Sequence, residues 1–244
     1  MVVVVSGKES LITGYISLIV KNKEGKELRR AIQPMRSLLR NFIVMLETMF
    51  KGMDTLWNKY TPSDAVDVDG NKFKLSFPAP DNTYGIPLGW RIDAEAGDKL
   101  KERGEPTDWG IMVGSSDDPN TINFWNLSQP YPHGSGSGYM NYLDTIVKEP
   151  YFDGSNVCIE IKRVIVNEAN VSQTVREIGI IAREFYTWKR FLIARDVLDS
   201  PIDVPPKGML EVTIVIQGIL APYNVFYVDD YCVGYDSSKV SKFE

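Results

Sequence analysis

Histidine, the side chain most often used for acid–base catalysis near neutral pH, occurs once in this chain of 244 residues. His133 lies in the segment Pro130–Gly138, which ends in the run Gly134-Ser-Gly-Ser-Gly138. A general base must be held within hydrogen-bond reach of the proton that it removes, and this segment has the composition of a mobile surface loop. We therefore expect His133 to have no partner and no catalytic role.

The same run superficially suggests a nucleophile elbow or a phosphate-binding loop. It has glycine where an elbow needs serine, it lacks the lysine of a phosphate loop, and it does not connect a predicted strand to a predicted helix. A linker-like loop is the preferred interpretation.

The sequence offers little that could hold a metal or a cofactor. The run Asp67-x-Asp69-Gly-Asn71 resembles part of a calcium loop, but the further spaced ligand and the bidentate glutamate are missing, and Gly70 falls too early. Cys158 and Cys232 are too far apart for a Cys-x-x-Cys site. We expect no metal, no cofactor and no catalytic residue.

A carboxylate pair for glycoside hydrolysis is defined by its separation in space, so a polysaccharide-degrading enzyme stays as the last alternative. The candidate carboxylates fall in predicted turns or on outward strand faces: Asp93, Glu95, Asp98, Asp117, Asp118, Glu160 and Glu177. Two of the predicted strands carry Arg176-Glu177 and Arg195-Asp196. These favour solvent-exposed cross-strand ion pairs, worth roughly 0.2–1 kcal/mol each, that would fix the strand register.

The net charge of −5 gives no overall attraction to nucleic acid or to an anionic membrane. The exception is the basic region Lys21–Arg40. We interpret it as a solvated face. The alternative is that it contacts nucleic acid, as the one region of the chain that could do so. The apolar run Val2–Val5 is too short for a signal peptide, and no stretch approaches the roughly 20 apolar residues of a membrane span. We expect no cleavable secretion signal and no membrane partner.

The elements that must position these residues are mostly strands. Alternating or continuous apolar residues, bounded by turn residues, predict strands over 157–166, 174–183, 190–198 and 209–220, with a short one in 109–115. An N-terminal hairpin is predicted from 11–22 and 26–32 around Gly25. The pattern predicts a mainly β protein, an antiparallel β-sandwich for which a jelly roll is one form.

One amphipathic helix is predicted after the hairpin, with Pro34 in its first turn and apolar residues at spacings of three and four from Leu38 to Met53. We expect it to pack across the sheet; a partner-binding surface is the alternative. A loop-rich insertion follows, in which Val66–Leu75 is predicted to be a hairpin turning at Gly70-Asn71, with Val68 opposite Phe73.

The predicted organisation has four parts. Residues 1–53 form an arm, hairpin and helix packed on the sandwich; 54–108 form the insertion; 109–220 form the sandwich core; 221–244 form an extended aromatic tail.

Three segments, two within predicted strands and one between the last two of them, carry a resemblance: Val175-Arg-Glu-Ile-Gly-Ile180, Leu192-Ile-Ala-Arg-Asp-Val-Leu198 and Pro201-Ile-Asp-Val-Pro-Pro-Lys-Gly208. Together with the turn-rich region after residue 114, they resemble a family of virion structural proteins from tailed phages and archaeal viruses. The resemblance covers residues 109–217. It implies a self-assembling component of the capsid, neck or tail, made in the host cytoplasm and located in the virion, whose partners are copies of itself and other virion proteins.

Both terminal segments are predicted to act between subunits. The strand-prone N-terminal run consists of Val2, Val3, Val4 and Val5, and it should pair with or be covered by another strand. The tail contains aromatic residues suited to anchoring on a neighbour: Tyr223, Phe226, Tyr227, Tyr231, Tyr235 and Phe243.

The alternative function is a receptor- or glycan-binding module. Its sugar platform would be formed by aromatic residues in predicted loops: Trp57, Trp90, Trp109, Trp125, Tyr131 and Tyr139.

Overall fold

The computed structural model describes residues 12–51, 63–75, 90–154, 156–184 and 188–219. In these residues the protein is mainly β, with antiparallel strand ladders and two short helices. The strands are β1 (Ile12–Lys21), β2 (Glu27–Pro34), β3 (Ser63–Val66), β4 (Lys72–Leu75), β5 (Trp90–Arg91), β6 (Gly110–Gly114), β7 (Asn141–Val147), β8 (Tyr151–Asp153), β9 (Asn156–Val166), β10 (Gln173–Glu184), β11 (Arg190–Val204) and β12 (Met209–Ile219). The helices are α1 (Arg40–Lys51) and α2 (Gly97–Glu102).

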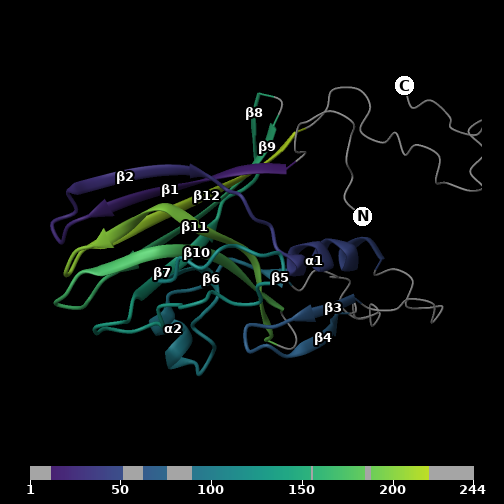
Figure 1. Ribbon diagram of the computed structural model, residues 1–244, viewed down its shortest axis with the longest axis horizontal. Helices are drawn as coiled ribbons and strands as arrows, with labels where there is room; N and C mark the ends of the chain where they lie inside the picture. The colour runs from purple at the N-terminus through teal and green to yellow at the C-terminus, as the bar shows by residue number, and fades with distance from the viewer. Residues whose placement is uncertain (1–11, 52–62, 76–89, 155, 185–187, 220–244) are drawn as a thin grey trace, which may run out of the picture.

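The larger sheet has the strand order β2-β1-β12-β9-β7, with β8 also paired to β9 (Figure 1). The predicted strands over 157–166 and 209–220 are confirmed as β9 and β12. The N-terminal hairpin is also confirmed, and Gly25 in its turn has a φ of +81°, a conformation that favours glycine. Because β1 pairs with β12 along its whole length, the hairpin is part of this sheet and does not lie on top of it.

The second sheet consists of β11 and β10, with β5 and β6 both paired to the other side of β10, and β3 and β4 form a separate two-stranded sheet. The predicted strands over 174–183 and 109–115 are confirmed as β10 and β6. The prediction ended β11 at Leu198, whereas the strand continues to Val204 and pairs with Gln173–Val175 after a register shift. Pro201 is tolerated inside it because β11 lies at the edge of the sheet, where a missing N–H breaks no ladder.

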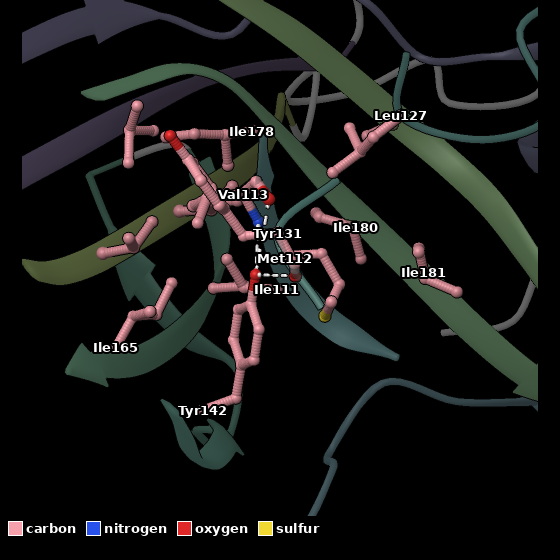
Figure 2. Close-up of a cluster of buried hydrophobic side chains, with 14 of the residues drawn as sticks. Ile111, Met112, Val113, Leu127, Tyr131, Tyr142, Ile165, Ile178, Ile180 and Ile181 are labelled. Atoms are coloured by element: carbon pink, nitrogen blue, oxygen red, sulfur yellow. Dashed lines mark hydrogen bonds between the residues drawn. The ribbon is translucent and has the colours of Figure 1, made fainter. Parts of the chain in front are cut away.

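One hydrophobic cluster combines alternate residues of β1, β9 and β12 with residues of β10, β11 and β6. Both sheets therefore contribute to the same core, as the alternating pattern of the strands requires. Figure 2 shows Tyr142 reaching from β7 into this cluster, where its hydroxyl donates a hydrogen bond of 2.8 Å to the carbonyl oxygen of Tyr131.

The predicted helix begins later than expected. Pro34 ends β2 instead of opening the helix, and α1 starts at Arg40. The residues between them follow β11, since Leu38 forms a bridge with Ala194 and the amide of Leu39 donates to the carbonyl oxygen of Ile193. These backbone hydrogen bonds outweigh the helical spacing of the apolar residues.

The predicted register of the Val66–Leu75 hairpin is wrong. Ala65, not Val68, lies opposite Phe73, and the turn is a longer loop over residues 67–71. Asp67 closes this loop, because its carboxylate accepts hydrogen bonds from the amides of Asp69 and Asn71. Val68 is then free to join the main core, where it is 3% exposed.

Candidate assembly surface

At one end of the larger sheet, apolar side chains are exposed on the face that elsewhere forms the core. Ile16, Ile214 and Ile161 lie side by side across β1, β12 and β9, and each is at most 2% exposed. Two residues further along these strands, Ile216 is half-buried and Ile159 is 36% exposed. The elements that cover this face therefore end between the row of Ile161 and the next row, which contains Ile159.

The outermost row crosses four strands. Ile12 of β1 pairs with Gly218 of β12, Gly218 pairs with Val157 of β9, and Val157 pairs with Phe152 of β8. Directly paired residues point to the same face of a sheet, so these side chains form one surface. Phe152 is 73% exposed. We call this apolar surface the overhang; it consists of Ile12, Val147, Phe152, Val157, Ile159 and Ile216.

The local sequence explains why the overhang forms. Gly154, with a φ of +61°, lets the chain reverse between β8 and β9, which places Phe152 beside Val157. In β9, Val157 and Ile159 continue the alternation that buries Ile161 and Ile165 further along the strand. Apart from Arg163, the inward-facing residues of β9 are all apolar, while only part of that face is covered.

A pocket of about 400 Å³ adjoins the overhang. Ile12 and Ile216 line it from the sheet, and Met35 and Leu38 line it from the connection between β2 and α1. A pocket lined largely by apolar side chains, with Thr13, Arg36 and Ser37 among them, next to an exposed apolar surface is the arrangement expected where a partner inserts a side chain.

The connection that forms the pocket wall is held by a buried carboxylate. Both oxygens of Asp196 lie 3.1 Å from the amide nitrogen of Arg36, and Asp196 is 2% exposed. Burial raises the pKa of Asp196 to about 6, although hydrogen bonds from the amides of Arg36 and Ser37 oppose the increase.

The two ends of the described chain meet at the overhang. Ile12, where β1 begins, pairs with Gly218, one residue before β12 ends. Residues 1–11 and 220–244 are therefore joined to the protein at this surface. The assembly residues predicted from the sequence, Val2–Val5 and the aromatic residues from Tyr223 to Tyr235, lie outside the described residues and stay predictions.

The prediction that His133 has no partner is wrong. Its side chain is 3% exposed, its Nε2 lies 3.0 Å from an oxygen of Asp98, and its Nδ1 accepts a 3.3 Å hydrogen bond from the amide of Tyr142. Gly97 in α2 packs against the ring so closely that an added Cβ would lie 2.3 Å from Nδ1. His133 thus connects α2 to β7, although the Gly/Ser composition around it suggested a free loop.

Replacing His133 with alanine should lower the free energy of unfolding by roughly 1–3 kcal/mol, because it removes two hydrogen-bonded contacts and leaves a void. Urea unfolding of the variant measures this loss. Ser135→Ala, in the exposed part of the same segment, is the control and should unfold like the original protein. Unchanged stability of His133→Ala would show that its contacts contribute nothing.

The two charged dipeptides form one of the predicted cross-strand ion pairs, Glu177 with Arg195, but this pair is buried and not solvent-exposed. Arg176 pairs with Asp117 instead of Asp196. Nε of Arg195 donates a 2.7 Å hydrogen bond to Glu177, and both side chains are fully buried. The remaining oxygens and N–H groups bind the segment between β6 and β7. Glu177 accepts from the amides of Ser128 and Gln129, and Arg195 donates to the carbonyl oxygen of Asp118. Because these groups are paired, the role of the ion pair is structural: it holds the segment between β6 and β7 against β10 and β11.

Arg163 is a buried cation that the sequence reasoning missed. Its guanidinium donates to the carbonyl oxygens of Leu143, Trp109 and Ile111 at 2.6–2.9 Å, and lies over the ring of Tyr142. Burial lowers the pKa of Arg163 to about 10, so it stays charged at neutral pH. The alternation of β9 could have identified it, because Arg163 occupies an inward position between Ile161 and Ile165.

The proposed sugar platform is not assembled by the residues that the structure describes. Trp109 is 2% exposed and Tyr131 is 9% exposed, so both belong to the core. Trp125 and Tyr139 are exposed, Trp57 lies outside the described residues, and the side chain of Trp90 is not described.

The remaining candidates from the sequence also have structural partners. Asp67 accepts hydrogen bonds within its own loop, and the described residues contain no group of three or more His, Cys, Asp or Glu side chains able to hold a metal. In the basic region, Lys21 pairs with Glu211, Arg30 with Glu27 and Arg36 with Asp199. These acidic partners reduce its attraction to nucleic acid.

Comparison with known proteins gives no match to a family model, a curated protein or a solved structure. In the part of the chain that the structure describes, neither helix has the length and apolar character needed to cross a bilayer.

Proposed function

We propose that this protein is a structural subunit of a virus particle, a component of the capsid, neck or tail that assembles with copies of itself and with other virion proteins. In this proposal the two sheets are the layers of an antiparallel β-sandwich of jelly-roll type. The observation that carries the proposal is the overhang, an apolar surface at the place where both terminal segments join the described protein.

A soluble monomer gains nothing by keeping Phe152, Ile159 and Val147 in one exposed patch, whereas burying a side chain of this kind contributes roughly 1.5–3 kcal/mol. Several such side chains in one patch are enough to stabilise a specific contact between subunits. The resemblance of the strand segments to virion proteins points to the same class of function.

Phe152→Asp should weaken self-assembly, raising the concentration of half-assembly by about thirtyfold or more, because a charge cannot enter an apolar contact without loss of its hydration. Light scattering coupled to size-exclusion chromatography and negative-stain imaging of the full chain measure the assembly. The original protein is expected to form a ring or an ordered polymer.

The matched control is Ile32→Asp. Ile32 is 64% exposed and lies opposite Ser17, on the outward face of the same sheet, so its replacement should leave assembly unchanged. A full-length protein that stays monomeric at all concentrations contradicts the proposal. Saturable binding of that monomer on a glycan array would favour the binding module, and turnover of a polysaccharide would favour the enzyme.

A further inference from the structure

We propose that the overhang and its adjoining pocket receive the aromatic segment 220–244 of a second copy of this chain. This inference rests on the proposed function and adds to it the identity of both contact surfaces, the acceptor on the larger sheet and the segment that binds there.

The acceptor side is defined by the described residues. Phe152, Ile159 and Val147 form an exposed apolar patch across β8, β9 and β7, and Ile216, which pairs with Ile159, lines the pocket of about 400 Å³. Met35 in the pocket wall has a flexible, polarisable side chain that adapts to an inserted ring. An apolar patch with a pocket beside it suits an extended segment that carries several apolar anchors.

The sequence of the segment fits this acceptor better than the N-terminal segment does. Residues 220–244 contain Tyr223, Phe226, Tyr227, Tyr231 and Tyr235, and large aromatic side chains are the usual anchors of a contact between proteins. Residues 1–11 contain no aromatic side chain. Their valine run is suited instead to adding a strand to a sheet edge.

The position of the attachment point favours a second copy over the same chain. β12 ends at Ile219 in the outermost part of the overhang, so a chain that continues in the strand direction leaves its own sheet there. Returning to its own apolar row requires an immediate reversal. The 25 residues that follow span about 80 Å when extended, which is enough to reach the same surface on a neighbour.

A complementation experiment with two full-length variants tests the proposal. The first variant, Phe152→Asp with Ile159→Asp, keeps the aromatic segment but has a damaged acceptor. The second, Phe226→Ser with Tyr227→Ser and Tyr231→Ser, keeps the acceptor but has a damaged segment. Each variant alone should be monomeric, or assemble only at a concentration about thirtyfold or more above the original protein.

Mixing the two variants in equal amounts should restore one productive contact and give a complex that contains both chains, detected by native mass spectrometry. Ile32→Asp, on the opposite face, is the control and should assemble like the original protein. Circular dichroism and urea unfolding confirm that each variant is folded; a variant that unfolds is replaced by its single substitutions, Phe152→Ser or Tyr227→Ser.

The outcomes separate this inference from the proposed function. If the original protein does not assemble, the proposed function fails. If it assembles but the mixture stays monomeric, or if either variant assembles like the original protein, the contact uses other surfaces and this inference is wrong. If the original protein is monomeric and the segment variant binds a synthetic peptide of residues 220–244, the segment occupies the overhang of its own chain.

Discussion

Replacing Glu177 with alanine is expected to lower the free energy of unfolding by about 3–5 kcal/mol, because it leaves the guanidinium of Arg195 buried without its anionic partner. Neither side chain has any exposed surface, so water cannot replace the lost interaction. The variant also loses the acceptor for the amides of Ser128 and Gln129, which then have no carboxylate to bind. Urea unfolding at neutral pH measures the difference.

Arg176→Ala provides the matched control from the same dipeptide. Arg176 is partly exposed, and its partner Asp117 lies 3.4 Å away on the surface, so the loss should stay within about 1 kcal/mol. The double variant Glu177→Leu with Arg195→Met removes both charges and should be more stable than Glu177→Ala alone. A loss below 1 kcal/mol for Glu177→Ala would mean that the buried pair contributes little to the fold.

The strands could be predicted because their side chains alternate between two environments. In β12, Leu210, Val212 and Ile214 are buried and face the core, while Glu211 and Thr213 point outward and are half-buried. Such a pattern fits only an extended chain with one covered face. It also locates the core, since the buried residues of β1 and β12 that the structure describes are all apolar.

The buried ion pair could not be predicted as buried, because the burial depends on a distant segment. Glu177 lies on the face of β10 opposite Ile178, and a pattern of strand residues alone makes that face look exposed. The segment between β6 and β7 covers it: Leu127 packs near Gly179, and the amides of Ser128 and Gln129 bind Glu177. No short-range sequence signal records where such a segment lies.

The overhang could not be predicted because its exposed residues have the sequence pattern of buried ones. Val157 and Ile159 have the same alternation as the buried Ile161, so the sequence makes the whole face look like core. Whether a strand end is covered depends on how far the opposing elements extend, and this is a property of the tertiary structure. The terminal segments, in contrast, were recognised as candidates from their valine and aromatic content alone.

A second large effect is expected in the dependence of stability on pH, through Asp196. The buried carboxyl has a pKa of about 6 in the folded protein, above its ordinary value of 3.8. A raised pKa in the folded state means that protonation favours folding, so this group's stabilising contribution is complete below pH 4 and is lost as the pH rises through 6. The charged groups that face it, Arg36 and Arg195, limit the shift without removing it.

Asp196→Asn should therefore change the slope of the free energy of unfolding against pH more than it changes that free energy at any single pH. Both proteins are unfolded in urea at each pH, and the free energy of unfolding of the variant is subtracted from that of the original protein. We expect this difference to fall by roughly 2–3 kcal/mol between pH 4 and pH 7. Asn keeps an oxygen that can accept from the amide of Arg36, so the pocket wall stays in place. Asp199→Asn, at the exposed partner of Arg36, is the control and should retain the slope of the original protein. Parallel curves for the original protein and Asp196→Asn would show that Asp196 does not titrate in this range.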